Sequence, residues 1–165
     1  MLIRSDTEVI RAIKHVADTP EVSVDCETTG LEKQDTPFAF SVAGPGFDYY
    51  FDESVLDYRI WDALKEVGPR TWYLQNAKFD LKMLKRKGVH LEGTFHDITS
   101  LGRIVRNDHL LYSLDAQAQR ELRIPKDKAL PDYIKKHGLY EVRTRRYSGE
   151  KYKVPQFYKA PLTVS

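Results

Sequence analysis

The stretch VSVDCETTGL, residues 22–31, alternates apolar and polar side chains before it reaches a glycine. Side chains two apart on a strand point to the same face, so the two valines and Cys26 share one face, and Asp25 and Glu27 share the other. Two neighbouring carboxylates repel each other, and burying them without partners is costly. The stretch therefore predicts a strand whose two acids are solvated at an exposed end, paired with lysines, or neutralised by something else.

Around this strand, the spacing of apolar residues predicts an α/β domain. The expected helices cover residues 6–18 (capped by Ser5 or Asp6), 54–67 (capped by Ser54) and 76–88, with further helices from residue 101 and over 113–122 (capped by Ser113). The expected strands cover residues 22–27, 37–44, 47–51, 71–75 and 94–98, and Gly44-Pro45-Gly46 joins the second and third as a hairpin. This order suits a mixed sheet covered by helices.

Length and composition indicate one domain, residues 1–165, with a core at about residues 1–125 and a tail at about residues 140–165. The single cysteine cannot form an internal disulfide, and no apolar run reaches membrane-spanning length, so we expect a cytoplasmic protein without membrane contact. The net charge of +2 conceals −5 in residues 1–97 (12 basic, 17 acidic) and +7 in residues 98–165 (14 basic, 7 acidic). Such asymmetry fits chance variation on a solvated surface, or a polyanion held near metal ions.

A third acid falls at the start of an expected helix, in QNAKFDLKML, residues 75–84. Asn76 and Asp80 are four apart and so share a helical face, although Asn76 also suits a helix N-cap and Asp80 can pair with nearby lysines. If Asp80 meets Asp25 and Glu27, divalent cations would neutralise the three carboxylates. Mg²⁺ prefers such hard oxygen ligands, and two ions about 4 Å apart can activate water and stabilise a leaving oxygen in phosphodiester cleavage.

The segments VDCETTGL and LQNAKFDLKML resemble the first two motifs of the DEDD-type 3′–5′ exonucleases, above all the proofreading domain of family A (DNA polymerase I-like) DNA polymerases. FHDITSLGRI and YSLDAQAQREL look like the family segment that links the second and third motifs, so the resemblance covers about residues 20–125. It implies an RNase H-like fold, a mixed five-stranded sheet with helices on both sides. It also implies two-metal hydrolysis of the 3′-terminal phosphodiester of single-stranded DNA, which releases mononucleotides.

The same resemblance assigns a role to each acid. Asp25 would bridge two divalent cations, Mg²⁺ or Mn²⁺. Glu27 would help to bind one of them and touch the 3′-hydroxyl, and Asp80 would hold the second, directly or through water.

Four further positions match family residues near the substrate, namely Thr28, Leu31, Gln75 and Asn76. Thr28 and Leu31 would contact the terminal nucleotide, Leu31 as an apolar wedge against the last base, and the other two would lie near the 3′-terminal nucleotides. Ordinary packing after the Gly30 turn is the alternative for Leu31. Asp97 also matches a family aspartate, and we interpret it as a helix cap rather than a catalytic group.

The family's third motif, Y-x-x-x-D or H-x-x-x-D, does not occur after Asp97. Tyr112 stands three residues before Asp115 rather than four, and Tyr58 and Asp62 have the right spacing but lie between the first two motifs. Two explanations compete: a fragment truncated before the last helix, which we favour, or a complete protein that has lost the motif. In either case we expect poor activity from this chain alone, because a ligand and the group that positions water are both lost.

The tail interleaves basic and aromatic side chains. They are Arg143, Arg145, Arg146, Lys151, Lys153 and Lys159, and Tyr140, Tyr147, Tyr152, Phe157 and Tyr158. They can contact phosphates and stack on the bases of single-stranded DNA, or the aromatics can pack on the domain while the charges stay solvated. The expected partners are a single-stranded DNA 3′ end and a polymerase domain in cis or trans, in a bacterial or phage-infected cell.

Three alternatives stay open at this stage. An RNase D-like 3′–5′ exoribonuclease would use the same carboxylates on RNA. A non-catalytic single-stranded nucleic-acid-binding module would keep the fold and bind DNA in EDTA. An unrelated α/β domain would place Asp80 far from Asp25.

Overall fold

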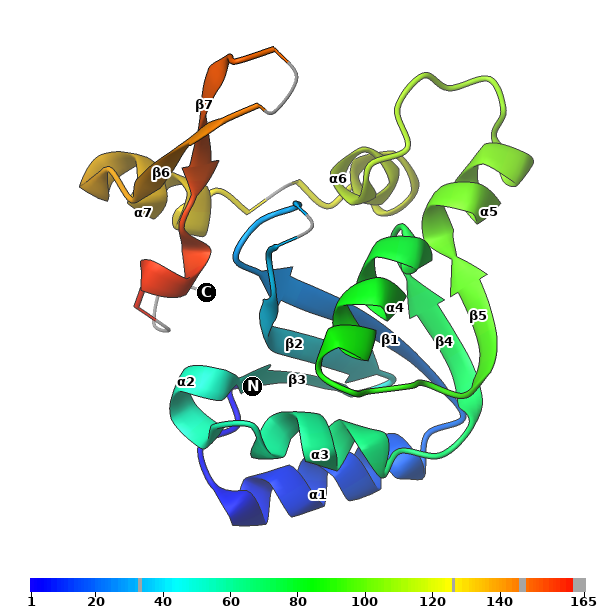
Figure 1. Cartoon of the computed structure of the whole chain (residues 1–165). Coiled ribbons are helices and arrows are strands. Elements are labelled where there is room, and N and C mark those ends of the chain that lie inside the picture. Colours follow the sequence, from blue (N-terminus) through cyan, green and yellow to red (C-terminus); the bar gives the residue numbers. More distant parts are fainter. Residues whose placement is uncertain (33, 126, 146–147, 162–165) are drawn as a thin grey trace.

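The computed structural model describes residues 1–32, 34–125, 127–145 and 148–161 (Figure 1). The helices are α1 (Asp6–Ala17), α2 (Glu53–Leu56), α3 (Arg59–Lys65), α4 (Ala77–Arg86), α5 (Ile98–Val105), α6 (Leu114–Gln117) and α7 (Ala129–His137), with a π turn at Ala118–Leu122 and a 3-10 turn at Phe157–Lys159. The strands are β1 (Glu21–Thr28), β2 (Pro37–Gly44), β3 (Phe47–Asp52), β4 (Arg70–Leu74), β5 (Gly93–Asp97), β6 (Tyr140–Thr144) and β7 (Lys151–Pro155).

The main sheet has five strands in the order β3-β2-β1-β4-β5. β1 pairs antiparallel with β2 and β2 with β3, whereas the β1–β4 and β4–β5 pairs are parallel. The expected mixed five-stranded sheet is therefore confirmed. Its first strand lies in the middle, so the acids of β1 have a strand on either side.

One face of the sheet is buried under α1, α3 and α4. The alternation predicted for β1 is confirmed, because Val22, Val24 and Cys26 are at most 8% exposed. The same core contains strand residues Phe40, Val42, Phe51, Trp72 and Leu74 and helix residues Val9, Val16, Ile60, Leu64, Met83 and Leu84. Removal of this apolar surface from water is the main favourable term in folding.

The opposite face of the sheet carries the polar side chains that alternate with the buried ones along β1. Neighbours across the strands on this face are Ser23 with Tyr73, Asp25 with Ser41, and Tyr73 with His96. Ser23 and Asp25 are exposed, and the other three are partly buried. α7 and the 3-10 turn reach this face, where Leu130 and Phe157 line a small pocket together with Glu27 and Tyr50.

The helix expected over residues 54–67 is two helices. Asp57 adopts a positive φ of 54°, which ends α2 and lets the chain turn before α3. The cap is also not Ser54: Asp52 accepts a hydrogen bond from the Ser54 backbone N–H at 2.8 Å. Periodicity alone did not show this break, because both helices bury side chains on the same side.

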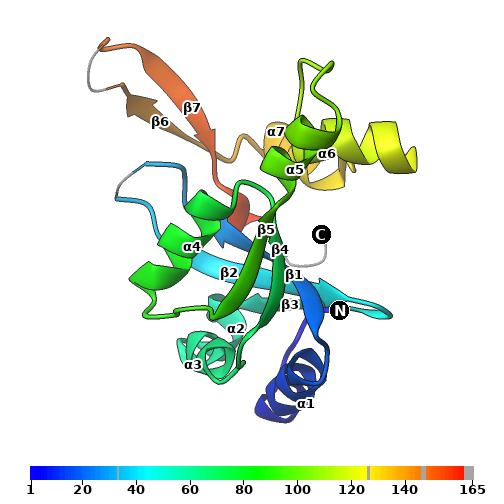
Figure 2. The same ribbon diagram turned by 90° about the vertical axis from the view of Figure 1, so that its right-hand side faces the viewer.

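The C-terminal part contains structure that periodicity did not predict. After α6, whose Ser113 cap is confirmed, α7 leads into an antiparallel β6–β7 hairpin. Figures 1 and 2 both show this hairpin projecting above the main sheet, on the side away from α1 and α3. Arg146 and Tyr147 of the tail lie outside the described residues. Within the described ranges, no helix is both long and apolar enough to cross a membrane.

Candidate active site

The acids of β1 lie where this strand leaves its parallel neighbour. β1 pairs with β4 only from Glu21 to Ser23, whereas its pairing with β2 continues to Thr28. The backbone beyond Ser23 therefore has no strand partner on the β4 side. Cys26 instead donates its backbone N–H to Oδ1 of Asp80 at 3.1 Å. A helix carboxylate thus satisfies a buried backbone donor that would otherwise be costly.

α4 brings Asp80 to this point. Asp80 lies in the first turn of the helix, where the positive end of the helix dipole favours a carboxylate, and it is only 2% exposed. The Cys26 thiol is a second hydrogen-bond partner, whereas Oδ2 is buried and has no partner among the described residues. Burial and the charge of Asp25 raise the pKa of Asp80 to about 7, although the hydrogen bonds from Cys26 oppose the shift.

Asp25 and Glu27 project from the polar face of β1, on either side of Cys26. Desolvation raises the pKa of both carboxyls, and the charge of Asp25 raises the pKa of Glu27 further. Asp25 therefore interacts electrostatically with both other acids. This places the three carboxylates in one neighbourhood, so the alternative that separates Asp80 from Asp25 is wrong.

Pairing with lysines, another alternative for these acids, is not found within the described parts of the chain. The ion pairs there use other carboxylates. Asp25 thus repels both Glu27 and Asp80, and none of the three acids has an ion-pair partner among the described residues.

The donor set fits hard divalent cations. All three groups offer carboxylate oxygens, which Mg²⁺ prefers, and the orphaned Oδ2 of Asp80 lacks a partner that a cation would supply. Across the described ranges no group of three or more His, Cys, Asp or Glu side chains is arranged so that it could by itself hold a metal ion. Mg²⁺ usually keeps several waters and takes one or two carboxylates together with substrate phosphates. The three acids are therefore candidate ligands, and their metal-binding role stays a prediction.

The last residue of β1, Thr28, and Leu31 in the loop that follows are the two residues expected to contact the terminal nucleotide. Thr28 donates its hydroxyl hydrogen to the Gly30 carbonyl at 2.8 Å, which shapes the turn. Leu31 is 82% exposed, so ordinary packing, the alternative for this side chain, is wrong. Both residues line a pocket that also reaches Glu27.

This pocket, of about 430 Å³, lies between the β1–β2 loop, α4 and the β6–β7 hairpin. Its volume is in the range of small-ligand sites. The apolar and aromatic lining comes from Leu31, Phe79, Val154, Pro155 and Phe157, and the polar lining includes Glu27, Thr28, Arg143, Tyr152 and Lys153. Sequence analysis anticipated the basic and aromatic character of the tail but not this position, and it missed Phe79, whose only signal was its place beside Asp80.

Gln75 and Asn76, the other two residues expected near the substrate, do not face this pocket. The Gln75 side-chain amide donates to the Tyr112 carbonyl at 2.9 Å, and its Oε1 is buried with no partner in the described ranges. Asn76 takes the N-cap position of α4 with a φ of 59° but makes no side-chain capping bond, so its interpretation as a side-chain cap is wrong. Neither residue lines the Leu31 pocket, and their contact with substrate stays a prediction.

Asp97 is a helix cap, as predicted. Its carboxylate accepts hydrogen bonds from the backbone N–H groups of Thr99 at 2.9 Å and Ser100 at 3.4 Å, at the start of α5. It also accepts the Asn76 backbone N–H at 3.2 Å. Asp97 therefore ties the first turn of α5 to the segment that enters α4.

Residues 1–136 of the chain match the family model described as 3′–5′ exonuclease. The chain belongs to this 3′–5′ exonuclease family. Two curated relatives of the exonuclease chain are both named DNA polymerase DpoZ. The relative from Salmonella phage PMBT28 is 30% identical over 151 residues, which is 86% of this chain and 22% of that protein. The relative from Acinetobacter phage SH-Ab 15497 is 33% identical over 127 residues, which is 70% of this chain and 19% of that protein.

The exonuclease chain therefore spans about a fifth of the length of these relatives. With its family match, this makes it a 3′–5′ exonuclease domain of the DNA-polymerase type.

Solved structures share the fold of this exonuclease domain. The Aedes aegypti Nibbler EXO domain superposes with a TM-score of 0.66 at 14% identity, covering 79% of this chain and 71% of that one. Escherichia coli RNase D gives 0.64 at 14% identity, covering 79% and 35%. Brucella melitensis NrnC with bound Mg²⁺ gives 0.57 at 17% identity, covering 67% and 57%. The expected RNase H-like exonuclease fold is confirmed.

Proposed function

We propose that this exonuclease domain removes nucleotides from the 3′ end of single-stranded DNA, with Asp25, Glu27 and Asp80 holding two divalent cations, Mg²⁺ or Mn²⁺. The observation that carries the proposal is the position of Asp80. Its Oδ1 is fixed to the backbone between the other two acids, while its Oδ2 is buried without a partner in the described ranges. A buried carboxylate oxygen in this state costs free energy unless a proton or a cation accompanies it.

When bound, the two cations would activate a water and stabilise the leaving oxygen. The residues of the chain hold the reacting groups around that centre. The hydrogen bond from Cys26 fixes the orientation of Asp80, and Glu27, at the pocket wall, would face the 3′-hydroxyl. Leu31, exposed beside the same pocket, would press against the last base.

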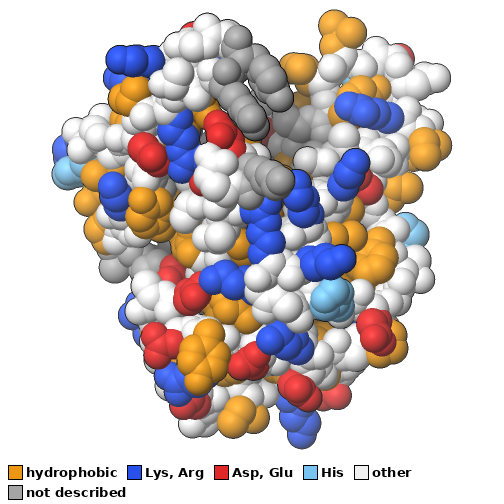
Figure 3. Space-filling model, viewed as in Figure 1, with side chains coloured by type: hydrophobic (Ala, Val, Ile, Leu, Met, Phe, Trp, Pro, Cys, Tyr) orange, Lys and Arg blue, Asp and Glu red, His pale blue; other side chains and the backbone are white. Residues whose placement is uncertain are grey.

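The surroundings of the site support a polyanionic substrate. α4 exposes Lys78, Lys82 and Lys85, and Figure 3 shows Lys and Arg side chains gathered over this helix. Positive charge near the site attracts phosphates and raises the rate of encounter. The pocket is of a size to receive one nucleoside.

The relatives support the biological setting. Both are DNA polymerases of phages, so we propose DNA as the substrate, a polymerase domain in cis or trans as the partner, and a phage-infected bacterial cell as the site of action. The third family motif is not among these 165 residues. An in-frame tyrosine and aspartate four apart in the codons beyond residue 165 would supply the missing acid.

The test is degradation of 5′-labelled single-stranded DNA, and of RNA with the same sequence, by the full product of the reading frame that contains these 165 residues. We expect trimming of the DNA from its 3′ end in Mg²⁺ or Mn²⁺, none in EDTA, and none with Asp25→Ala. Asp62→Ala, which removes an exposed acid of α3, is the matched control and should retain activity.

Two results would overturn the proposal. Preferential trimming of RNA would favour an exoribonuclease, to which the fold likeness with RNase D already points. Binding of single strands that persists in EDTA, without turnover in any metal, would favour a non-catalytic module.

A further inference from the structure

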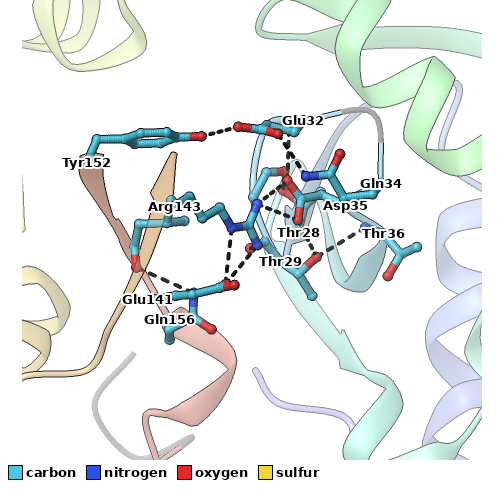
Figure 4. A network of polar contacts seen from close by, with 12 residues as sticks. Thr28, Thr29, Glu32, Gln34, Asp35, Thr36, Glu141, Arg143, Tyr152 and Gln156 are labelled. Atoms are coloured by element: carbon cyan, nitrogen blue, oxygen red, sulfur yellow. Dashed lines mark hydrogen bonds and ion pairs between the residues drawn. The ribbon is translucent and has the colours of Figure 1, made fainter. Parts of the chain in front are cut away.

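The β6–β7 hairpin is joined to the β1–β2 loop by a charged contact. Arg143 of β6 donates from Nη1 to both carboxylate oxygens of Asp35, at 2.9 and 2.7 Å, and from Nη2 to the Thr29 carbonyl at 3.4 Å. Beside it, the Tyr152 hydroxyl of β7 donates to Glu32. Figure 4 shows Arg143 and Tyr152 reaching from the two hairpin strands to the same loop.

The contact between Arg143 and Asp35 is buried, and both carboxylate oxygens of Asp35 accept hydrogen bonds. The side chains of Asp35 and Arg143 are 3% and 15% exposed. Asp35 also accepts the Glu32 backbone N–H at 2.8 Å and the Thr29 hydroxyl at 3.1 Å. Burial alone raises the pKa of Asp35, but these bonds, with that from Arg143 the strongest, lower it overall. The carboxylate is therefore held ionised, ready to pair with Arg143.

Gly30 leaves the space that this pair fills. A Cβ on Gly30 would lie 2.5 Å from Oδ2 of Asp35 and 2.8 Å from Nη1 of Arg143. Both distances are shorter than a van der Waals contact, so any side chain here would displace the pair. We call Arg143, Asp35 and Gly30 the hairpin latch.

The latch sets the position of one wall of the Leu31 pocket. The β7 side of the pocket consists of Tyr152, Lys153, Val154 and Pro155, and the opposite wall is the loop that carries Leu31. No hairpin residue belongs to the main hydrophobic cluster, as far as the described ranges show. The hairpin is thus held to the β1–β2 loop by polar contacts, while Tyr158, just after β7, packs edge-on against Phe38 of β2.

We propose that Arg143 is a positioning residue that, through the latch, holds the hairpin at the distance from Leu31 at which the pocket fits the terminal nucleoside. The inference rests on the proposed function, because it assigns the pocket to the substrate end. Arg143 acts on affinity for the 3′ end and not on the carboxylates that carry the chemistry.

The binding test uses a single-stranded oligonucleotide with 2-aminopurine at its 3′ terminus, titrated in EDTA so that no turnover occurs. Arg143→Gln should weaken binding by about tenfold or more, since truncating one partner of a buried charge pair detaches what it holds. Lys136→Gln removes one positive charge from an exposed position of α7, the helix that leads into the hairpin, and should change binding by no more than about twofold, the effect of one rim charge.

A second variant approaches the latch from the loop. Gly30→Ala should weaken binding like Arg143→Gln, and the double variant should be no weaker than either single one, because both break the same contact. Arg143→Lys should lie between wild type and Arg143→Gln, since lysine keeps the charge but loses the bonds that Nη2 makes to the Thr29 carbonyl and to Glu141. Thermal unfolding of each variant checks that the core is intact.

Turnover separates this inference from the proposed function. In the protein as encoded, Arg143→Gln should raise KM for single-stranded DNA and leave kcat unchanged, whereas Asp25→Ala should abolish turnover. Latch-dependent binding without any metal-dependent turnover would refute the exonuclease proposal alone. Equal binding by Arg143→Gln and Lys136→Gln, additive effects of Gly30→Ala and Arg143→Gln, or no binding by wild type would each overturn the latch.

Discussion

Asp80 is a buried acid whose pKa is raised toward neutral pH. In the folded protein its pKa is raised to about 7, against an ordinary value of 3.8. Between these values the native state binds more protons than the unfolded state. Raising the pH through this window therefore lowers the free energy of unfolding when no metal is bound. Burying the Asp80 carboxylate therefore lowers the free energy of unfolding at neutral pH, a cost that a bound cation would offset.

Asp80→Asn should remove this pH dependence. In EDTA, the free energy of unfolding of wild type should fall relative to that of the variant by about 2–3 kcal/mol between pH 5 and pH 8, because about two pH units separate pH 5 from the folded pKa and each contributes about 1.4 kcal/mol. Urea unfolding at the two pH values measures the difference. Asp62→Asn, on an exposed acid of α3, is the control, and an equal pH slope for wild type and Asp80→Asn would contradict the burial of a charged Asp80.

Leu31 provides a second test at the residue scale. Because it is 82% exposed, Leu31→Ala should change stability by no more than about 0.5 kcal/mol. The affinity of the variant for single-stranded DNA should fall about fivefold or more if the side chain contacts the last base, because burying a leucine side chain contributes about 1.5–3 kcal/mol. Ile10→Ala, on the 70% exposed Ile10 of α1, should leave both quantities unchanged. Equal affinities for the two variants would remove Leu31 from the substrate site.

At the scale of elements, the junctions between strands and helices place the acids. β1 ends its pairing with β4 early, and the first turn of α4 fills the resulting gap with Asp80. α5 is tied to the same region because Asp97 accepts backbone N–H groups from both α5 and Asn76. The rigidity of the site therefore depends on how these helices begin.

Asp97→Ala should destabilise the domain by about 1–2 kcal/mol, the usual loss for a helix cap. Asp97→Asn keeps an accepting oxygen and should lose much less. Urea unfolding of the two variants measures the effect. If Asp97→Ala instead abolished nuclease activity with unchanged stability, Asp97 would have a catalytic role rather than the capping role seen in the structure.

The elements differ in how far local sequence predicts them. Strand alternation in residues 22–27 and the caps at Ser5 and Ser113 are local rules, and the structure confirms them. The break at Asp57 and the β6–β7 hairpin were missed. A positive φ at a non-glycine residue and a two-stranded ladder depend on tertiary contacts that no short window of sequence contains.

At the scale of the whole molecule, charge is arranged differently in space than along the chain. The basic surface of α4 belongs to the half of the sequence with a net charge of −5. The tail, from the basic half, packs its Arg143 against the acidic loop of the other half. The charge imbalance along the chain therefore does not describe the folded surface, where Arg143 and Lys153 of the basic half line the same pocket as Glu27 of the acidic half.

Divalent cations should stabilise the whole domain through the candidate site. We expect Mn²⁺ to raise the melting temperature. At a hundredfold excess over its dissociation constant, it should add about 2.7 kcal/mol to the free energy of unfolding. The rise should be larger at pH 8 than at pH 6, because the ligands must lose their protons to bind. It should be absent in Asp80→Asn and present in Asp62→Asn. An unchanged response in Asp80→Asn would exclude this carboxylate as a ligand.

The sequence by itself determined the strand at residues 22–27, the shared face of its two acids, the mixed sheet and the family, because each follows from residue patterns within about ten positions or from motifs read directly. Only the tertiary structure decided that Asp80 bonds the backbone between those acids, across 54 residues. It alone showed that Arg143 reaches Asp35 across 108 residues to form the pocket wall. Such contacts depend on how distant elements pack, and the sequence of each element does not record the partner it will meet.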